Sequence, residues 1–269
     1  MRAKIIKIIL ILSGVLFITL MLILPLATVL VYALRQGWYT FVSAVTDHYA
    51  VNALNLTLLA TGITLVVNTV FGLFAAWAIT KFRFRGKQVL ITLIDIPFSI
   101  SPIIAGLVFI LVFGRIGWAY PLLEAWDVKI VFAVPGIVLA TIFVTFPFVS
   151  RELIPLMQAQ GSEEEEAAAL MGAKGLYIFR KVTFPHIKWG LLYGVILCTA
   201  RAMGEFGAVS VVSGHLRGKT NTLPLHVEIL FSEFRLTASF AVASILVVIA
   251  IIILILRNIV EYRLKREEE

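Results

Sequence analysis

Long apolar stretches constrain the fold of this chain more than any other feature. Six of them have 20 or more residues, and a helix needs roughly 20 apolar residues to cross the hydrocarbon core of a bilayer. The six stretches are 5–34, 51–80, 89–113, 130–150, 189–213 and 237–256. The whole chain is 60% hydrophobic and 14% charged, whereas soluble domains are about 45–50% apolar and about 25% charged. The sequence therefore predicts an all-α integral membrane protein, in which residues 1–269 form a single domain of six transmembrane helices.

The first stretch follows Arg2, Lys4 and Lys7, as the apolar region of a signal peptide follows basic residues. Its apolar run is too long for a signal peptide, and no cleavage site of small residues ends it. We therefore expect residues 5–34 to be retained as the first membrane span.

The positions of the basic residues predict which side of the membrane each connection faces. Most of the 23 lysines and arginines lie in the N-terminus, the connections 81–88 and 151–188, and the C-terminal tail. Cytoplasmic loops of membrane proteins carry an excess of Lys and Arg, so we expect both termini and both connections to face the cytoplasm. The net charge of +7 then belongs to the inner surface of the membrane, and no nucleic-acid partner is expected.

The connection 151–188 is unusually long and is patterned. Within it, Ser162 precedes four consecutive glutamates and then three alanines. Ser162 with Glu165 three residues later fits a capping box, and carboxylates in a first turn suit the positive end of a helix dipole. The pattern predicts a short helix that starts near Glu163 and weakens at Gly172 and Gly175, where a C-cap glycine is expected. Its alanines allow close approach to another surface.

The same connection carries a fixed series of residues. They are Glu166-Ala167-Ala168, three residues, Gly172, nine residues, and Val182-x-Phe184-Pro185. This series resembles the E-A-A signature of the permease subunits of bacterial ABC importers, with valine and phenylalanine as conservative departures. The resemblance implies that the short helix is a coupling helix, which sits in a groove of a cytoplasmic ATPase subunit. It assigns the charged contact to Glu166, the close packing to Ala167 and the turn to Gly172.

The chain itself carries no phosphate-binding loop of the form Gly-x-x-x-x-Gly-Lys-Ser/Thr. We therefore expect no catalytic residue and no cofactor here, with ATP and Mg bound by a partner ATPase chain. No metal site is expected either, because the four histidines are spread over both sides of the membrane and cannot converge on one ion.

Arg201, in the predicted fifth span, is the first candidate for a residue on a translocation pathway. It lies about 12 residues from the cytoplasmic end of that span, or about 18 Å at 1.5 Å per residue, where a charge is costly and commonly paired. Glu205, one helical turn later, is the expected partner. The pair either fixes helix packing or places an arginine beside the path of an anion. Ser99 and Ser101, flanked by two prolines, are further candidates, although the prolines also suit a kink for packing alone.

Three stretches, 132–141, 151–157 and 200–214, carry a narrower resemblance. They are similar to sulfate and molybdate importer permeases, and within that group to the W-type permease subunits of sulfate/thiosulfate importers. The resemblance implies a heterodimer with a homologous T-type permease subunit, a dimer of ATPase subunits, and an extracytoplasmic sulfate-binding protein. It also implies a multi-pass location in the bacterial inner membrane. A molybdate or tungstate importer is the alternative within the group.

Two other classes of protein remain as remote alternatives. A membrane enzyme would need a catalytic motif, and the sequence contains neither His-Glu-x-x-His nor Gly-x-Ser-x-Gly. A secondary transporter usually shows two related halves, and it would have no use for a coupling helix.

Overall fold

The computed structural model describes residues 2–268, except for the side chains of residues 2, 3, 5 and 264–268. Every regular element in this part of the chain is a helix, which confirms the predicted all-α class. In chain order the elements are α1 (Arg2–Ile18), η1 (Thr19–Ile23), α2 (Leu24–Leu34), α3 (Trp38–Val45), α4 (His48–Lys81), α5 (Lys87–Ser99), α6 (Pro102–Phe113), α7 (Tyr120–Ala125), α8 (Val134–Thr145), α9 (Pro147–Gln160), α10 (Glu163–Leu170), α11 (Gly175–Ile178), η2 (Phe179–Thr183), α12 (Phe184–Met203), α13 (Gly207–Val212), α14 (Leu223–Ser232) and α15 (Leu236–Glu268).

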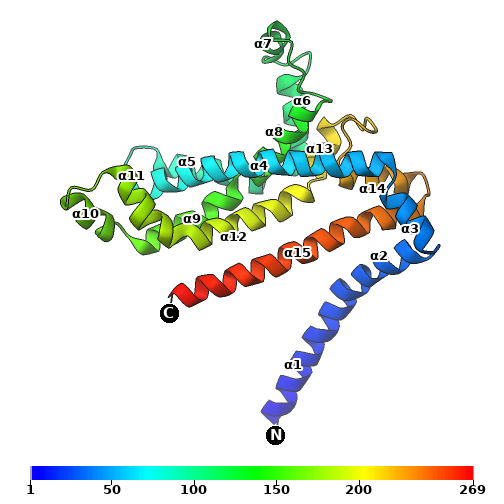
Figure 1. Cartoon of the computed structure of the whole chain (residues 1–269), viewed down its shortest axis with the longest axis horizontal. Helices are drawn as coiled ribbons and strands as arrows, with labels where there is room; N and C mark the ends of the chain where they lie inside the picture. Colours follow the sequence, from blue (N-terminus) through cyan, green and yellow to red (C-terminus); the bar gives the residue numbers. More distant parts are fainter. Residues whose placement is uncertain (1, 269) are drawn as a thin grey trace.

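The helix α4 runs along one side of the bundle and is its longest helix among the described residues. At about 1.5 Å per residue, its 34 residues make it about 51 Å long. The helices α8, α9, α12 and α14 pack along it (Figure 1). Small residues allow this close packing, since Ala60 and Ala76 are buried. A Cβ atom on Gly72 would lie only 2.9 Å from Cβ of Val149 in α9.

A buried polar cluster joins three of these helices. Asn68 of α4 donates hydrogen bonds from Nδ2 to Oγ1 of Thr145 at 2.8 Å and to the backbone oxygen of Ile142 at 3.3 Å. The same nitrogen lies 3.7 Å from Sγ of Cys198 in α12. Because a buried polar group destabilises the fold unless it is hydrogen-bonded, this cluster fixes the register of α4, α8 and α12.

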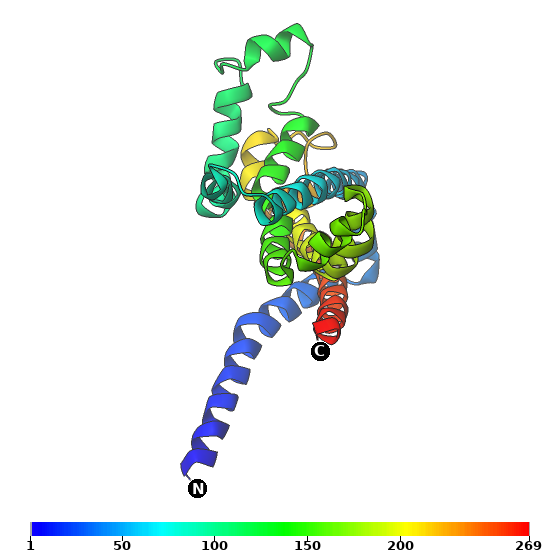
Figure 2. The same ribbon diagram turned by 90° about the vertical axis from the view of Figure 1, so that its left-hand side faces the viewer.

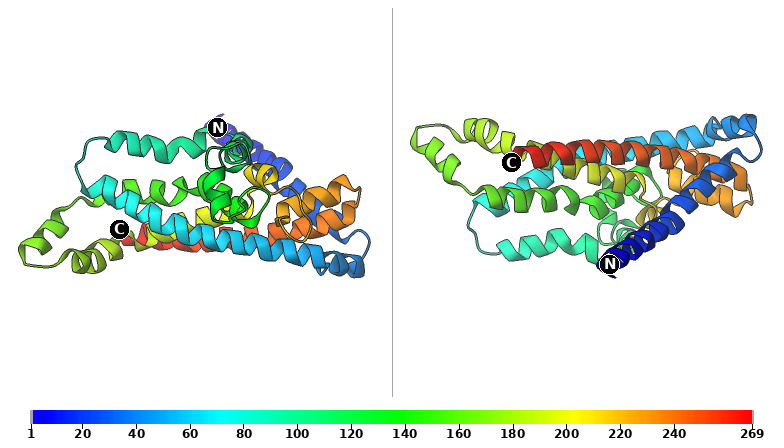
Figure 3. Two further views of the ribbon diagram at one scale, coloured as in Figure 1. Left: turned by 90° about the horizontal axis from the view of Figure 1, so that it is seen from above. Right: turned by 90° about the horizontal axis from the view of Figure 1, so that it is seen from below.

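The two ends of the bundle carry different connections. The helices α10 and α11, the end of α15 and the connection between α4 and α5 gather at one end (Figures 1 and 3). The helices α3 and α14 lie at the opposite end. The two connections that the basic residues assign to one side of the membrane therefore lie at the same end of the structure.

Two parts of the chain extend away from the bundle. Figure 2 shows α1 projecting on one side and α6 with α7 on another. The apolar side chains of α1 are exposed, with 66% exposure at Leu10 and 64% at Phe17. Contiguous apolar surface of this extent marks contact with a membrane or another protein. In an integral membrane protein these helices face lipid or a partner helix.

Among the residues that the structure describes, four helical segments are long and apolar enough to cross a membrane, namely Ile6–Leu34, His48–Lys81, Val134–Gln160 and Leu236–Arg263. The helices α5 and α6 make a fifth candidate when the pair is counted as one span. The chain is therefore a multi-pass membrane protein. The six-span count and the cytoplasmic position of both termini remain predictions.

The predicted span 89–113 is sharply bent, as its prolines indicated. The axes of α5 and α6 differ by 108°, and Ile100 and Ser101 between them have extended backbone angles. A residue that precedes proline is disfavoured in the helical region, whereas proline is favoured at the first position of a helix. Pro102 therefore ends one helical segment and starts the next.

The predicted span 189–213 is not one continuous helix. The helix α12 ends at Met203, and α13 begins at Gly207. Glycine lowers helix stability, and Gly204 follows the last residue of α12. The side chain of Glu205 accepts a hydrogen bond from a backbone N–H of α13 at 2.9 Å, which stabilises the interrupted backbone.

The helical segment that contains the predicted span 130–150 extends into the predicted connection 151–188. It begins at Val134 and continues through α9 to Gln160. The helix η2 leads directly into α12, so α9 and α12 are joined by residues 161–183. Arg151, the first charged residue after the predicted span, lies within this helical segment and forms an ion pair with a neighbouring helix. The bounds of the span within the bilayer remain a prediction.

Candidate coupling surface and translocation pathway

The helix α10 forms the short helix predicted in the cytoplasmic connection. It begins at Glu163, and Gly172 follows it with a φ of +85°. Because residues with a side chain rarely adopt positive φ, Gly172 supplies the expected turn. The predicted capping box is wrong: Ser162 makes no side-chain bond to the backbone of α10. Its hydroxyl instead donates to Oε1 of Glu166 at 2.5 Å.

The outward surface of α10 combines charged, small and large apolar residues. Glu166 and Ala167 are exposed. At the end of the helix, Leu170 is 90% exposed and Met171 is 83% exposed. Large apolar side chains at this exposure, beside carboxylates and alanines, suit contact with a protein surface better than contact with water.

Glu165 links α10 to the rest of the protein through an ion pair and a hydrogen bond. Its carboxylate lies 3.0 Å from Nζ of Lys81, the last residue of α4, and accepts a hydrogen bond from Thr183 at 2.5 Å. Lys81 also donates to the backbone oxygen of Gly161 at 2.5 Å. The side chains of Lys81 and Glu165 are only 8% and 15% exposed. These contacts link α10 to the end of α4 and to η2, the segment that precedes α12.

The break between α5 and α6 lies against the break between α12 and α13. A Cβ atom on Gly207, the first residue of α13, would lie 2.9 Å from Cβ of Pro102, the first residue of α6. A Cβ atom on Gly106 would lie 2.7 Å from the backbone oxygen of Ala208. Such glycines let two helices pack at backbone distance. In membrane proteins, interrupted helices occur where the backbone is buried in protein or lines a cavity.

Arg201 and Glu205 form the predicted ion pair at the second break. Nη1 of Arg201 lies 2.6 Å from Oε2 of Glu205. The Glu205 side chain is 1% exposed and the Arg201 side chain is 33% exposed. Because the other carboxylate oxygen accepts the N–H of Ala208, the pair stabilises the start of α13. The third of the arginine surface that is exposed is available to an anion, so the structure accommodates both interpretations of the pair.

Ser99 and Ser101 lie at the first break. Ser99 is the last residue of α5, Ser101 directly precedes α6, and both are exposed. All four predicted pathway residues therefore lie at the two breaks, which meet where Pro102 packs against Gly207. Their part in transport remains a prediction.

A second ion pair, between Arg151 of α9 and Asp95 of α5, was not predicted from the sequence. Nε of Arg151 lies 3.0 Å from Oδ1 of Asp95. Arg151 belongs to the predicted connection 151–188 and Asp95 to the predicted span 89–113, so their sequence positions did not suggest a pair. A signal was present in the sequence, since Asp95 belongs to a series of polar residues spaced by three and four residues along α5.

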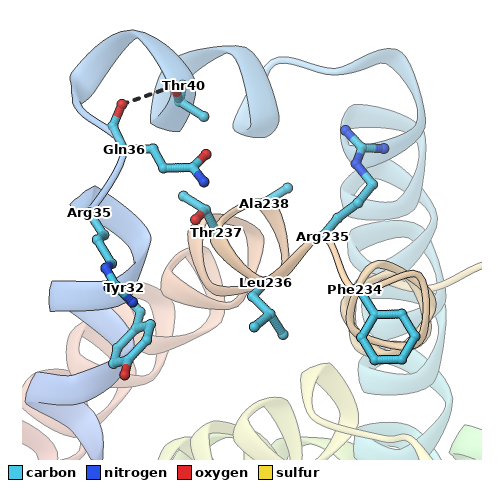
Figure 4. A pocket seen from close by; sticks show the side chains of 9 residues that line it. All are labelled: Tyr32, Arg35, Gln36, Thr40, Phe234, Arg235, Leu236, Thr237 and Ala238. Carbon is cyan, nitrogen blue, oxygen red and sulfur yellow. Dashed lines mark hydrogen bonds between the residues drawn. The ribbon is translucent and has the colours of Figure 1, made fainter.

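A pocket of about 590 Å³ lies at the end of the bundle opposite α10. Figure 4 shows its lining side chains from α2, α3 and the segment that leads into α15. Arg35 lies at one side, with its guanidinium carbon 5.5 Å from the centre of the Tyr32 ring. The predicted pathway residues do not line this pocket, so it is separate from the two helix breaks.

The chain is similar to known transport proteins in both sequence and structure. Residues 68–266 match the family described as "Binding-protein-dependent transport system inner membrane component". The chain is 49% identical over 254 residues to the "Sulfate transport system permease protein CysW" of Synechococcus elongatus, covering 94% of this chain and 89% of the relative. It is 35% identical over 254 residues to the "Sulfate transport system permease protein CysT" of Salmonella typhimurium, covering 94% and 92%.

The fold also resembles a solved structure. A chain in the crystal structure of a bacterial alginate ABC transporter superposes with a TM-score of 0.81, covering 97% of this chain and 96% of that chain. The two sequences are 16% identical, so this likeness concerns the fold.

Proposed function

Because the chain belongs to the family of binding-protein-dependent transport system inner membrane components, we propose that it is the permease subunit of an ATP-driven sulfate importer. In this role it forms half of the translocation pathway and is not itself catalytic. Thiosulfate, which shares the charge and the tetrahedral shape of sulfate, is the second expected substrate.

The observation that carries this proposal is the difference between two identities. The chain is 49% identical to the W-type sulfate permease and 35% identical to the T-type permease, over 94% of its length in both cases. This difference supports a W-type subunit with a homologous T-type subunit as its partner. The apolar surface of α1, which lies outside the bundle, offers area for such a heterodimer.

The other proposed partners act at the two ends of the bundle. We propose that a dimer of ATPase subunits, which binds the ATP and Mg, docks at α10. An extracytoplasmic sulfate-binding protein docks at the opposite end. The description of the family as an inner membrane component that depends on a binding protein supports this arrangement in the bacterial inner membrane.

The coupling mechanism follows from the contacts of α10. Closure of the ATPase dimer displaces α10, and the contacts of Glu165 with Lys81 and Thr183 pass this displacement to α4 and η2. The helix α4 packs against α12, and η2 continues directly into α12. The helix breaks at Ser101 and Gly204 are then the points where the pathway changes from facing one side of the membrane to facing the other.

The test is ATP-dependent uptake of labelled sulfate into vesicles that contain this chain, the T-type subunit, the ATPase and the binding protein. We expect uptake that requires all four proteins and that resists an excess of unlabelled molybdate. Vesicles without the ATPase are the control. Uptake of molybdate in place of sulfate would overturn the proposed substrate. If neither anion is taken up, the proposed role as an importer subunit is overturned.

A further inference from the structure

A polar stripe runs along α5 on the side that faces away from the protein core. Gln88, Thr92, Asp95 and Ser99 follow one another at intervals of four, three and four residues. On a helix of 3.6 residues per turn they fall within an arc of about 60°. The buried residues of α5 lie on the opposite side. Polar side chains on a membrane helix are unfavourable against lipid, and they face water or another protein.

Arg151 of α9 lies beside this stripe in a defined orientation. Its Nε lies 3.0 Å from Oδ1 of Asp95, and its guanidinium carbon lies 4.8 Å from the centre of the Phe98 ring. The Phe98 ring packs in turn against Phe148 of α9, with 5.2 Å between the ring centres. The contact with Asp95 uses Nε, and 55% of the arginine side chain is exposed. The Nη donors are therefore available to a ligand.

The pair lies well inside both helices. At 1.5 Å per residue, Arg151 is about 14 Å from the end of α9, and Asp95 is about 12 Å from the start of α5. These two helix ends lie at the same end of the bundle as α10. A charged pair at matching depth in two membrane helices indicates an aqueous path or a binding site.

We infer that the polar stripe of α5 lines the α10-side half of the translocation pathway, and that Arg151 is the residue there that contacts the transported anion. The ligand is a divalent tetrahedral oxyanion, because a guanidinium offers paired donors that match two of its oxygens. Asp95 is a positioning residue that holds the guanidinium toward the path. This inference rests on the proposed import of sulfate and names a contact for it.

The charges of Arg151 and Asp95 together favour weak, reversible binding of the anion, as transport requires. The carboxylate of Asp95 neutralises Arg151 and repels a dianion, so binding at Arg151 is weak and release is fast. Removing this carboxylate therefore strengthens the site, whereas removing the guanidinium abolishes it. If the pair only joins α5 to α9, loss of the carboxylate and loss of the guanidinium should weaken the structure to the same extent. The two interpretations therefore predict different results for the two substitutions.

The experiment uses the complete transporter in nanodiscs with Ser99→Cys in this chain, without ATP. The labelling rate of this cysteine by a thiol reagent is measured in sodium sulfate and in sodium chloride of equal ionic strength. The background control is the complex without the substitution, because its Cys198 is buried. We expect sulfate to slow labelling several-fold, Arg151→Gln to remove this protection, and Asp95→Asn to increase it.

Equal protection in the parent and in Arg151→Gln would overturn the inference, as would a cysteine at position 99 that does not label. Loss of protection in Asp95→Asn to the same extent as in Arg151→Gln would show a purely structural pair. Uptake of sulfate by a transporter that shows no protection would overturn this site but not the proposed function. Protection by molybdate instead of sulfate would support the site and overturn the proposed substrate.

Discussion

The buried carboxylate of Glu205 makes a quantitative prediction about Arg201. The Arg201→Met variant keeps the apolar part of the side chain but leaves a carboxylate that is 1% exposed without its counter-charge. Removing one member of a buried ion pair costs about 3–5 kcal/mol. Since a third of the arginine is exposed and screened by solvent, we expect about 3 kcal/mol, the lower end of the range. This loss lowers the ratio of folded to unfolded protein by about a hundredfold.

The double variant Arg201→Met with Glu205→Gln is the matched control. Glutamine keeps an oxygen that accepts the backbone N–H of Ala208, which now lies 2.9 Å from the Glu205 carboxylate, and it removes the unpaired charge. We expect most of the lost stability to return, so that the two changes are strongly non-additive, as neighbours usually are.

Two measurements separate the open interpretations of this pair. Chemical unfolding of the purified transporter in detergent gives the stability, and ATP-driven sulfate uptake gives the function. If the pair is structural alone, the double variant recovers both. If Arg201 also contacts the anion, stability returns and uptake does not. An Arg201→Met variant as stable as the parent would refute the argument from a buried carboxylate.

Three further predictions concern packing and coupling. Gly106→Ala places a Cβ atom 2.7 Å from a backbone oxygen of α13 and is expected to cost about 1–3 kcal/mol in the same unfolding assay. Gly62→Ala in α4 places its Cβ atom in open space and should be neutral or stabilising by up to about 1 kcal/mol. Equal effects of the two substitutions on stability would contradict the packing argument. Glu166→Lys should leave the chain in the membrane but abolish sulfate-stimulated ATP hydrolysis, whereas Glu124→Lys in α7 should not; normal stimulation would remove Glu166 from the coupling surface. Lys81→Met should uncouple ATP hydrolysis from uptake at unchanged amounts of assembled complex, because α10 loses its tie to α4; unchanged sulfate uptake per ATP would disprove that tie.

The local features of this fold were predictable from the sequence. The apolar stretches predicted membrane helices because burying that much apolar surface requires lipid. The start of α10 followed from the carboxylates that suit the positive end of a helix dipole, and the turn at Gly172 from the freedom of glycine to adopt positive φ. The Arg201–Glu205 pair was predicted from a spacing of four residues on one expected helix, and it forms although α12 ends at Met203.

Contacts between distant segments were decided only by the tertiary structure. Glu165 was expected to cap its own helix but bonds to Lys81, 84 positions earlier in the chain. Arg151 was expected to follow the end of a span, yet it lies inside the helical segment Val134–Gln160 and pairs with Asp95 of α5. Local sequence preferences carry no information about which distant side chain satisfies a charge. The two helix breaks likewise meet through distant contacts, since Gly207 packs against Pro102 and Gly106 against Ala208.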